Sequence, residues 1–377
     1  MTEKQQLQLQ KPKWVYFGGR IRLSEEAVFH ISSEAVVRGL NVFEGLKGVW
    51  QVDGSFGILA VERHWRRLKR SAKLLHIPFE MSLAEFDDAC HSLVQMLYET
   101  ERNMWIRATL YVTEGHWGVG TKSDLVLTAF HCPKGLPEPI KTGVSTWQRA
   151  TDTTLPYRIK TSANYQVARL AKIEGRDRGY PEMVLLNQYG RVSETIGSAI
   201  LIVRDGQVLT PPSWEGAFES ITIDIVESFC KTTGIPFARR PIDRTELIIA
   251  DEMAIVGTLN DLTIVSSIDG AAFGDAPILK AIAERYMRAF TGEEPHPSVD
   301  LSRRPPAARL GPPSRPAAAA SPEGGLDLLA PQQPPLPDVA AATFGKIKPR
   351  VTTFGRVRAS ILKSGPLQSI ALFLFGA

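Results

Sequence analysis

The composition of the chain changes abruptly after Pro297, and this change limits how much of the sequence can fold. Residues 301–340 contain ten Pro and eight Ala, a composition that cannot build a packed core. The alternation of apolar and polar residues that marks strands and helices ends before this point. We therefore expect folded structure up to residue 298, and a Pro/Ala-rich, basic, disordered tail over 299–377.

Most of the positive charge of the chain also lies in this tail. The 377 residues have a formal net charge of +4, whereas residues 301–377 contain ten Lys or Arg against three acidic residues. The preceding part is therefore slightly acidic, which argues against nucleic acid as its partner. The tail has few aromatic residues for base stacking, so we interpret it as a solvated linker. A shifted reading frame in a GC-rich gene would give a similar composition, and the sequence leaves this alternative open.

The three cysteines indicate a reducing compartment. Cys90, Cys132 and Cys230 are odd in number and far apart, without the spacing of a metal site, so we interpret them as buried thiols. The first residues, MTEKQQLQLQKPKW, lack the apolar core of a secretory signal. No stretch reaches the roughly 20 apolar residues of a membrane span. We expect a cytoplasmic protein without a metal ion or a membrane partner.

The sequence before the tail divides into two units of mixed α and β structure. Residues 1–137 combine short strands with a helical pattern over 64–76 and a second helix capped by Ser82. A connection with Pro and Lys, from Pro133 to Pro139, separates this unit from residues 138–298. Strands in the second unit alternate with helices expected over 164–178, 222–232 and 276–290.

Common catalytic motifs are absent from the sequence. It contains no Walker loop, no HExxH, no GxSxG and no GxGxxG after a strand, and GHWGVG at 115–120 has its glycines in the wrong order and context. These absences argue against the usual nucleotide-binding, zinc-protease and hydrolase functions.

A series of short segments carries the chemical information instead. In order, they are WVYFGGRIR, NVFEG (41–45), HWRRLKRSAK (64–73), WIRATLYV (105–112), STWQRATDTTLPYRIKTSANY (145–165), GRVSE (190–194), ITID (221–224) and ADEMAIVGTLNDLTIVSSIDG (250–270). Together they resemble the class IV aminotransferases, which include branched-chain amino-acid and D-amino-acid aminotransferases, over about residues 14–292. The resemblance implies the two-domain α/β (α+β) fold of fold type IV enzymes. In this fold a smaller N-terminal domain and a larger, β-barrel-like C-terminal domain hold pyridoxal 5′-phosphate between them.

The resemblance assigns three residues to the reactive part of this cofactor. Lys160 corresponds to the Schiff-base lysine, which also moves the proton between substrate Cα and cofactor C4′. Glu194 corresponds to the acid that pairs with the pyridine nitrogen, so that the ring can accept electrons. Tyr165 corresponds to the phenol that hydrogen-bonds the cofactor O3′. From residue type alone, the three would be a surface lysine, an exposed strand residue and a packing residue.

Phosphate binding requires a guanidinium group and free backbone N–H groups at a helix start. Arg67, in an HxxRL pattern, corresponds to the family's phosphate arginine. Ile221 and Thr222 open a predicted helix whose amides would point at the phosphate, and Thr258 would add a hydroxyl. Without the resemblance, Arg67 would belong to a solvated basic helix face.

The resemblance also implies a substrate pocket. The turn Gly257-Thr258-Leu259 corresponds to the segment whose amides bind the substrate carboxylate. Phe43 falls on an aromatic pocket position, and Arg107 on the arginine that accommodates the second carboxylate of glutamate in branched-chain enzymes. The family usually has an aromatic residue where this chain has Arg38. Such a guanidinium either turns away, into solvent or onto an acid, or faces the ligand and selects an anionic or polar substrate.

Three other positions depart from the family pattern. Thr195 and Ser220 stand where glycine is common, and Ala199 stands where asparagine is common. Cofactor binding is compatible with these changes, and they leave open which substrate the chain takes.

The function that these residues imply is transamination between an amino acid and a 2-oxo acid. We expect leucine, isoleucine or valine with 2-oxoglutarate as substrates, and a homodimer in which loops of the partner subunit close the pocket, as in the family. An aminodeoxychorismate lyase, or a D-amino-acid or amine transaminase, would share Lys160, Glu194 and Arg67, and Arg38 favours these alternatives. Residue types do not distinguish L from D selectivity.

Overall fold

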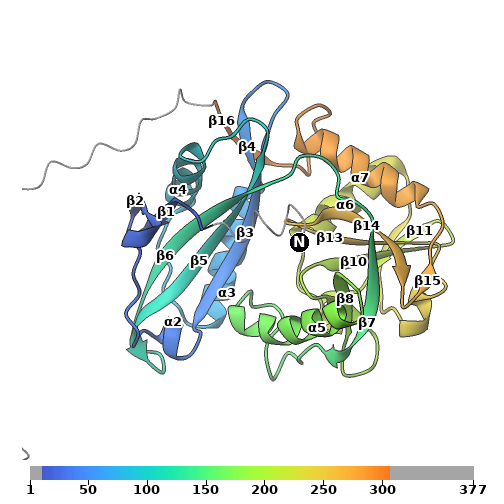
Figure 1. Ribbon diagram of the computed structural model, residues 1–377, viewed down its shortest axis with the longest axis horizontal. Coiled ribbons are helices and arrows are strands. Elements are labelled where there is room, and N and C mark those ends of the chain that lie inside the picture. Colours follow the sequence, from blue (N-terminus) through green and yellow to red (C-terminus); the bar gives the residue numbers. More distant parts are fainter. Residues whose placement is uncertain (1–10, 306–377) are drawn as a thin grey trace, which may run out of the picture. The chain divides into compact units, whose positions relative to one another are not determined.

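The computed structural model describes residues 11–305 of the chain. The expected tail beyond residue 305 lies outside the described residues. Two β-sheets organise the described part, and each is covered by its own helices (Figure 1).

The first sheet has seven strands in the order β16-β4-β3-β5-β6-β1-β2, and all of its neighbouring strands pair antiparallel. Its strands are β1 (Trp14–Phe17), β2 (Arg20–Leu23), β3 (Asn41–Trp50), β4 (Phe56–Leu59), β5 (Asn103–His116), β6 (Val119–Cys132) and β16 (Leu301–Arg304). A turn at Asp53-Gly54 joins β3 to β4, with Gly54 at φ +82°.

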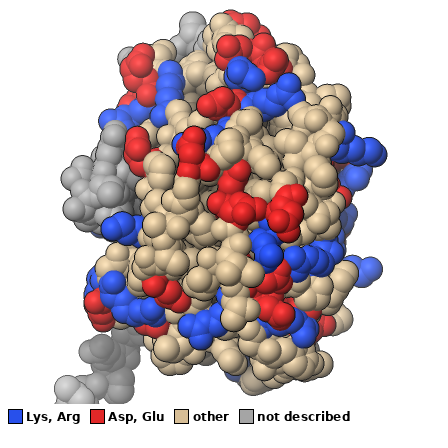
Figure 2. Space-filling model, turned by 90° about the vertical axis from the view of Figure 1, so that its right-hand side faces the viewer, with Lys and Arg blue, Asp and Glu red and all other residues tan. Residues whose placement is uncertain are grey.

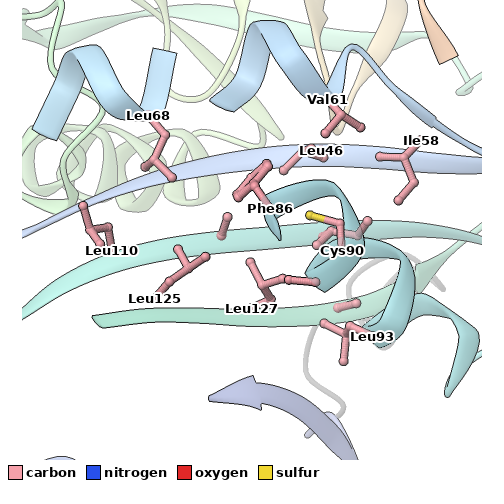
Figure 3. Packing of buried hydrophobic residues seen from close by; sticks show 14 of the residues in the cluster. Leu46, Ile58, Val61, Leu68, Phe86, Cys90, Leu93, Leu110, Leu125 and Leu127 are labelled. Atoms are coloured by element: carbon pink, nitrogen blue, oxygen red, sulfur yellow. The ribbon is translucent and has the colours of Figure 1, made fainter. Parts of the chain in front are cut away.

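Helices α3 (Val61–Leu74) and α4 (Leu83–Gln95) cover one face of this sheet, and the short helix α2 (Glu34–Val37) precedes β3. Ser82 caps α4 as expected, because its hydroxyl accepts from the Glu85 N–H while the Glu85 carboxylate accepts from the Ser82 N–H. Apolar side chains from both helices and from β3, β5 and β6 form the core between them; Figure 3 shows Leu46, Leu68, Phe86, Leu110 and Leu127 there.

Strand β3 is buried on both faces, which explains its continuous run of buried residues. Successive side chains of a strand point to opposite faces. Val42 and Leu46 belong to the core under the helices, whereas Val49 packs with residues of the C-terminal half. Two charged residues, Glu44 and Lys47, are nevertheless buried in this strand, and each has an oppositely charged partner.

The second sheet has nine strands, with the order β12-β11-β10-β13-β14-β7-β8-β9 and β15 paired to β14. Its strands are β7 (Ile140–Gln148), β8 (Glu182–Leu186), β9 (Val192–Thr195), β10 (Ala199–Arg204), β11 (Gln207–Thr210), β12 (Phe237–Arg239), β13 (Glu252–Gly257), β14 (Asp261–Ile268) and β15 (Ala271–Ala272). The expected boundary at residues 137 and 138 falls between the end of β6 and the start of β7.

Three helices pack on this curled sheet: α5 (Tyr165–Asp177) contacts β7 and β8, whereas α6 (Ile221–Thr233) and α7 (Pro277–Phe290) contact β13 (Figure 1). Their bounds agree with the expected helices within one residue at each end. Gly179, at φ +79°, lies just past the end of α5, where a left-handed residue commonly ends a helix.

Strand β16 lies within the residues that we expected to form the tail, so this part of the expectation is wrong. Leu301 to Arg304 pair antiparallel with β4, and Arg304 forms ion pairs with Asp87 and Asp88 of α4. Pairing with the exposed edge of β4 satisfies backbone N–H and C=O groups of both strands. The composition of this segment does not reveal that such an edge is available to it. The residues that follow Pro305 lie outside the described residues.

An apolar cluster joins elements of the two sheets. It combines Val49, Leu59 and Ala60 with residues of α6, α7 and the segment before β16. The Ala60 N–H donates to the carbonyl of Asp300 at 2.7 Å. These contacts fix the N-terminal end of α3 against the C-terminal half, and therefore place Arg67 of α3 near α6.

Charges of both signs are mixed on the molecular face that Figure 2 shows. The described part contains ion pairs such as the one that joins Arg239 to both Asp224 and Glu227. Within residues 11–305, no helix combines the length and the apolar composition that crossing a bilayer requires.

Candidate active site

Lys160 lies between the two sheets, in the segment that connects β7 to α5. Its backbone N–H donates to the Ser71 hydroxyl of α3 at 3.2 Å, and its carbonyl accepts from the Phe43 N–H of β3 at 2.8 Å. Its Nζ donates to the Tyr165 hydroxyl at 2.9 Å. Residues of the N-terminal half therefore hold the backbone of Lys160, while a residue of α5 holds its amine.

Three aromatic rings surround the Lys160 amine. Nζ lies 4.6 Å from the ring centroid of Phe218, 5.1 Å from that of Phe43 and 5.5 Å from that of Tyr165. Aromatic faces attract a cation and leave little room for water. The amine is half-buried, so a small molecule can reach it in a largely apolar environment.

Glu194 of β9 is held by two donors. Its Oε1 accepts from Arg149 Nη2 at 2.7 Å, and its Oε2 accepts from the Phe218 N–H at 2.9 Å. Only 8% of Glu194 is exposed, so its carboxylate has a defined orientation. Neither donor was predictable from the sequence, because Arg149 and Phe218 have no feature that distinguishes them from packing or surface residues.

The guanidinium of Arg67, in α3, also contacts the ring of Phe218. It lies 4.6 Å from the Phe218 ring centroid, and its Nη1 donates to the carbonyl of Glu219 at 2.7 Å. Lys160 and Arg67 thus both lie against the Phe218 ring, although they are far apart in the sequence. The structure brings Lys160, Tyr165, Glu194 and Arg67 together around this ring.

A buried carboxylate orients Arg67. Both oxygens of Glu44 accept from the guanidinium, from Nε and from Nη2, at 2.7 Å each, and Oε2 also contacts His64 Nδ1 at 2.7 Å. Burial raises the pKa of Glu44, but the charge of Arg67 and hydrogen bonds from Arg67 and His64 outweigh this effect and lower it to about 2. Burial lowers the pKa of His64 and outweighs the hydrogen bond and the charge of Glu44, which raise it. Glu44 and His64 are not among the residues predicted from the sequence, although a glutamate inside an apolar strand is a usable signal.

Ile221 and Thr222 form the first turn of α6, next to Arg67. The first N–H groups of a helix have no partner within the helix and attract anions. Ser220 caps α6, because its hydroxyl accepts from the Ile223 N–H at 3.3 Å. This cap gives a physical reason for serine at a position where glycine is common in the family.

Thr195 and Ala199 flank a short loop between β9 and β10. The Thr195 hydroxyl donates to the Ser198 carbonyl and accepts from the Ser198 N–H, each at 3.0 Å. Thr195 therefore closes this loop with its own side chain. Ala199 belongs to the core under α6 and α7.

The turn Gly257-Thr258-Leu259 connects β13 to β14 and ends at Asp261, which forms a buried ion pair with Lys47 of β3. Thr258 is half-buried there. This ion pair ties the turn to the N-terminal half. Lys47 and Asp261 are not among the site residues predicted from the sequence.

Leu259 and Arg107 line one cavity of about 390 Å³, a volume in the range of small-molecule sites. Trp105 and Phe130 also line it, with their ring centroids 5.0 Å apart. The Arg107 guanidinium lies 3.7 Å from the centroid of the Phe43 ring, and burial lowers its pKa. The structure therefore places Arg107 and Leu259 on one mostly apolar cavity, whereas Phe43 contacts the Arg107 guanidinium and is not part of the cavity lining.

Arg38 makes its contacts elsewhere. Its Nη1 donates to Glu34 Oε1 at 3.1 Å, and its guanidinium lies 4.7 Å from the ring centroid of Trp117 in the β5–β6 hairpin. Glu34 is buried and also accepts from the Trp117 N–H at 3.1 Å. The sequence left open whether the Arg38 guanidinium faces the ligand or turns away into solvent or onto an acid. In the structure it binds an acid, Glu34.

The family model for class IV aminotransferases (Amino-transferase class IV) matches residues 41–268. The branched-chain-amino-acid aminotransferase of Salmonella typhimurium is 31% identical over 295 residues, which cover 75% of this chain and 94% of that protein.

Solved structures of branched-chain aminotransferases have the same fold. One from Thermoproteus uzoniensis with norvaline has a TM-score of 0.73 at 31% identity and covers 78% of this chain and 99% of its own. One from Thermobaculum terrenum in its PLP form has a TM-score of 0.71 at 29% identity and covers 78% and 98%. The match extends over the segments that supply Lys160, Glu194 and Arg67, and on this evidence the chain belongs to the class IV aminotransferase family.

Proposed function

We propose that this chain is a pyridoxal-phosphate-dependent aminotransferase in which Lys160 binds the cofactor covalently. The observation that carries the proposal is the arrangement around Phe218. Lys160 and Arg67 lie against its ring, and its N–H donates to Glu194. A nucleophilic amine, an anion-binding guanidinium and an oriented carboxylate are the three groups that this cofactor requires.

The polar groups of the site fit those of pyridoxal phosphate. Arg67 and the first amides of α6, at Ile221 and Thr222, would bind the phosphate, with the Thr258 hydroxyl as a further donor. Glu194 would bind the pyridine nitrogen, and Tyr165 the ring hydroxyl. When bound, the cofactor supplies an electron sink for the pair released at substrate Cα.

The side chains then divide the remaining work. The Lys160 amine takes the proton from Cα of the amino donor and, in the second half-reaction, gives a proton to Cα of the new amino acid. The Tyr165 hydroxyl, which already accepts from Nζ, holds the amine in position. Arg149 keeps the Glu194 carboxylate oriented. Phe218 and Phe43 exclude water from the reacting groups, so the proton moves between Lys160 and the substrate and not to solvent.

The proposed substrates are a branched-chain amino acid and 2-oxoglutarate. Trp105, Phe130 and Leu259 offer apolar contacts to an aliphatic side chain in the cavity beside Arg107. Arg107 would pair with the second carboxylate of 2-oxoglutarate. The relatives named above are branched-chain aminotransferases, which supports the same choice.

Covalent labelling tests the cofactor assignment. After incubation with pyridoxal phosphate and reduction with borohydride, we expect a phosphopyridoxyl group on the peptide that contains Lys160, as measured by peptide mass spectrometry. A label on another lysine would refute the assignment. Addition of single L- or D-amino acids to the unreduced holoenzyme, followed by visible absorbance, then identifies the amino donor. Reaction with D-amino acids or amines alone would favour the alternative class IV activities.

Arg38 provides a test of the substrate assignment. Because its guanidinium is bound to Glu34 and Trp117, we expect Arg38→Tyr to change kcat/KM for leucine by less than about tenfold, or about 1.4 kcal/mol. Steady-state kinetics with leucine and with an acidic amino acid provide the measurement. A hundredfold gain for leucine together with loss of the acidic substrate would show that Arg38 contacts the ligand.

We also propose a homodimer in the cytoplasm. Apolar side chains gather, exposed, on the segment before β3 and on the β5–β6 hairpin: Val28, Phe29, Ile31, Val36, Val37, Trp117 and Val119. Large exposed apolar groups of this kind mark interaction surfaces, and Arg38 and Glu34 connect the two segments. The free, buried cysteines are consistent with a reducing compartment.

A further inference from the structure

A second cavity, of about 440 Å³, lies between α3 and the start of α6. We call it the α3–α6 cavity. Its charged lining residues are Arg63, Arg66, Arg67, Arg70, Glu219, Asp224 and Arg239, and the rest of its lining comes mainly from β11, the segment 211–220 and α6. Five guanidinium groups against two carboxylates make its lining basic.

The arginines of α3 follow from helical spacing. Arg63, Arg66 or Arg67, and Arg70 are three or four residues apart and therefore share one face of the helix. Arg63 pairs with Asp224 at 2.7 Å, Arg66 with Glu62 at 2.5 Å and Arg70 with Glu219 at 2.7 Å, each through Nη2. A guanidinium has five N–H donors, so the paired arginines retain donors for an anion.

A buried hydroxyl also lines the cavity. Ser193 of β9 is fully buried, and within the described residues its Oγ has no hydrogen-bond partner. An unsatisfied buried hydroxyl is costly in a native protein, and a ligand with an acceptor or a donor would remove that cost. Ser193 therefore points to an occupant of the cavity, independently of the arginines.

The cavity differs from the cofactor site, although the two sites share a wall. Successive residues of a strand face opposite sides: Glu194 contacts Arg149 and the Phe218 N–H, whereas Ser193 lines the α3–α6 cavity. Neither Lys160, nor Tyr165, nor Glu194, nor Thr258 lines it. The shared wall is Arg67 with Phe218, Glu219, Ser220 and Ile221.

The rest of the lining is mostly apolar and includes a solvent-exposed indole. Ile200, Pro211, Pro212, Ala217 and Ile223 form it, and Trp214, 66% exposed, stands among them. Such a surface suits the face of a planar or apolar group. A cluster of arginines, by contrast, suits a phosphate, which accepts from several guanidinium groups at once.

We propose that the α3–α6 cavity is a second ligand site, which binds a small phosphate monoester with a planar apolar body. Arg63 and Arg70 bind the phosphate, Trp214 contacts the planar body, and Ser193 hydrogen-bonds the ligand. The site communicates with the cofactor site through the segment 218–220, since the Glu219 carbonyl accepts from Arg67 and the Phe218 N–H donates to Glu194.

The test uses the holoenzyme. Only its first step, fixation of the cofactor on Lys160, rests on the proposed function. Borohydride reduction first fixes the cofactor on Lys160, and mass spectrometry verifies the label. Isothermal titration with pyridoxine 5′-phosphate, which lacks the aldehyde, then measures further binding. We expect one additional molecule per chain, quenching of Trp214 fluorescence, and much weaker binding of pyridoxine without its phosphate.

Three variants locate the site. Arg63→Ala/Arg70→Ala is expected to weaken binding by about tenfold or more, because two charge-assisted contacts are lost. Arg176→Ala, an exposed arginine of α5 paired with Asp177, is the matched control and should bind as the wild type does. Ser193→Ala should also weaken binding without lowering the melting temperature, because the hydroxyl has no partner to lose.

Two results would overturn the proposal. If the reduced holoenzyme binds no further molecule, the cavity is only the phosphate end of the cofactor site. If the double variant and the wild type bind equally, the ligand lies elsewhere. Absence of a label on Lys160 refutes the proposed function instead; titration of the unlabelled protein then still tests the cavity, since the double variant should bind more weakly than the Arg176→Ala control.

Discussion

Lys160→Ala is expected to lower kcat/KM for transamination by about a thousandfold or more, because in the proposed mechanism one side chain provides both the covalent attachment and the proton transfer at substrate Cα. The fold should remain intact. The side chain donates one hydrogen bond to Tyr165 and contacts the ring faces around it, whereas the backbone contacts of Lys160 to Ser71 and Phe43 do not depend on residue type. Steady-state kinetics with leucine and 2-oxoglutarate, and thermal unfolding, provide the measurements.

Two further variants complete this experiment. Lys73→Ala, an exposed lysine of α3, is the matched control and should retain wild-type activity. Tyr165→Phe removes the hydroxyl that accepts from the Lys160 amine, and we expect a smaller loss, of about tenfold, as for a single hydrogen bond to a charged group. Activity of Lys160→Ala within tenfold of the wild type would exclude this lysine as the catalytic residue.

Glu44→Gln is expected to have the largest effect on stability. Breaking a buried ion pair by removing one charge costs about 3–5 kcal/mol, because the other charge stays buried without compensation. Here the charge that remains is Arg67, which is only 7% exposed. Urea unfolding at pH 7 measures the loss. We also expect weaker binding of pyridoxal phosphate, since Glu44 fixes the guanidinium through two hydrogen bonds.

The effect of Glu44→Gln on stability should also depend on pH. The pKa of Glu44 is lowered from 4.5 to about 2 in the folded protein, so its carboxylate stabilises the fold above about pH 4.5, and this contribution is lost as the pH falls towards 2. The stability difference between the wild type and Glu44→Gln should therefore shrink on acidification. Glu62→Gln is the matched control, because Glu62 pairs with Arg66 on the exposed side of the same helix and should affect stability little. Equal stability of Glu44→Gln and the wild type at pH 7 would contradict the interpretation.

The residues that meet at the site were predictable from the sequence because each of them lies in a distinctive segment. Lys160 and Tyr165 lie in one segment, and Glu194 and Arg67 lie in two others. The order of these segments along the chain, which is the order of the family, was enough to relate them to one site. The helices were predictable within one residue where a cap or an ending glycine marks them, as Ser82 and Gly179 do.

The partners of these residues were not predictable, for a physical reason. Periodicity shows which side chains share a face, but not what covers that face. Glu44 and Lys47 are three residues apart on β3, yet one pairs with Arg67 of a helix and the other with Asp261 of the second sheet. Phe218 lies in a loop, where no period exists. For Arg38, the sequence showed an unusual charge, and only the fold shows Glu34 and Trp117 beside it.

The return of the chain to its first sheet has a consequence for synthesis on the ribosome. Strand β4 has β3 on one side and β16 on the other, so its second edge stays open until residues 301–304 have left the exit tunnel. Val49 and Leu59 also stay uncovered until α6 and α7 have been made. An open strand edge beside apolar side chains is a site for pairing with other nascent chains. The edge of β4 is therefore exposed to wrong pairing for as long as the residues between β6 and β16 are being synthesised.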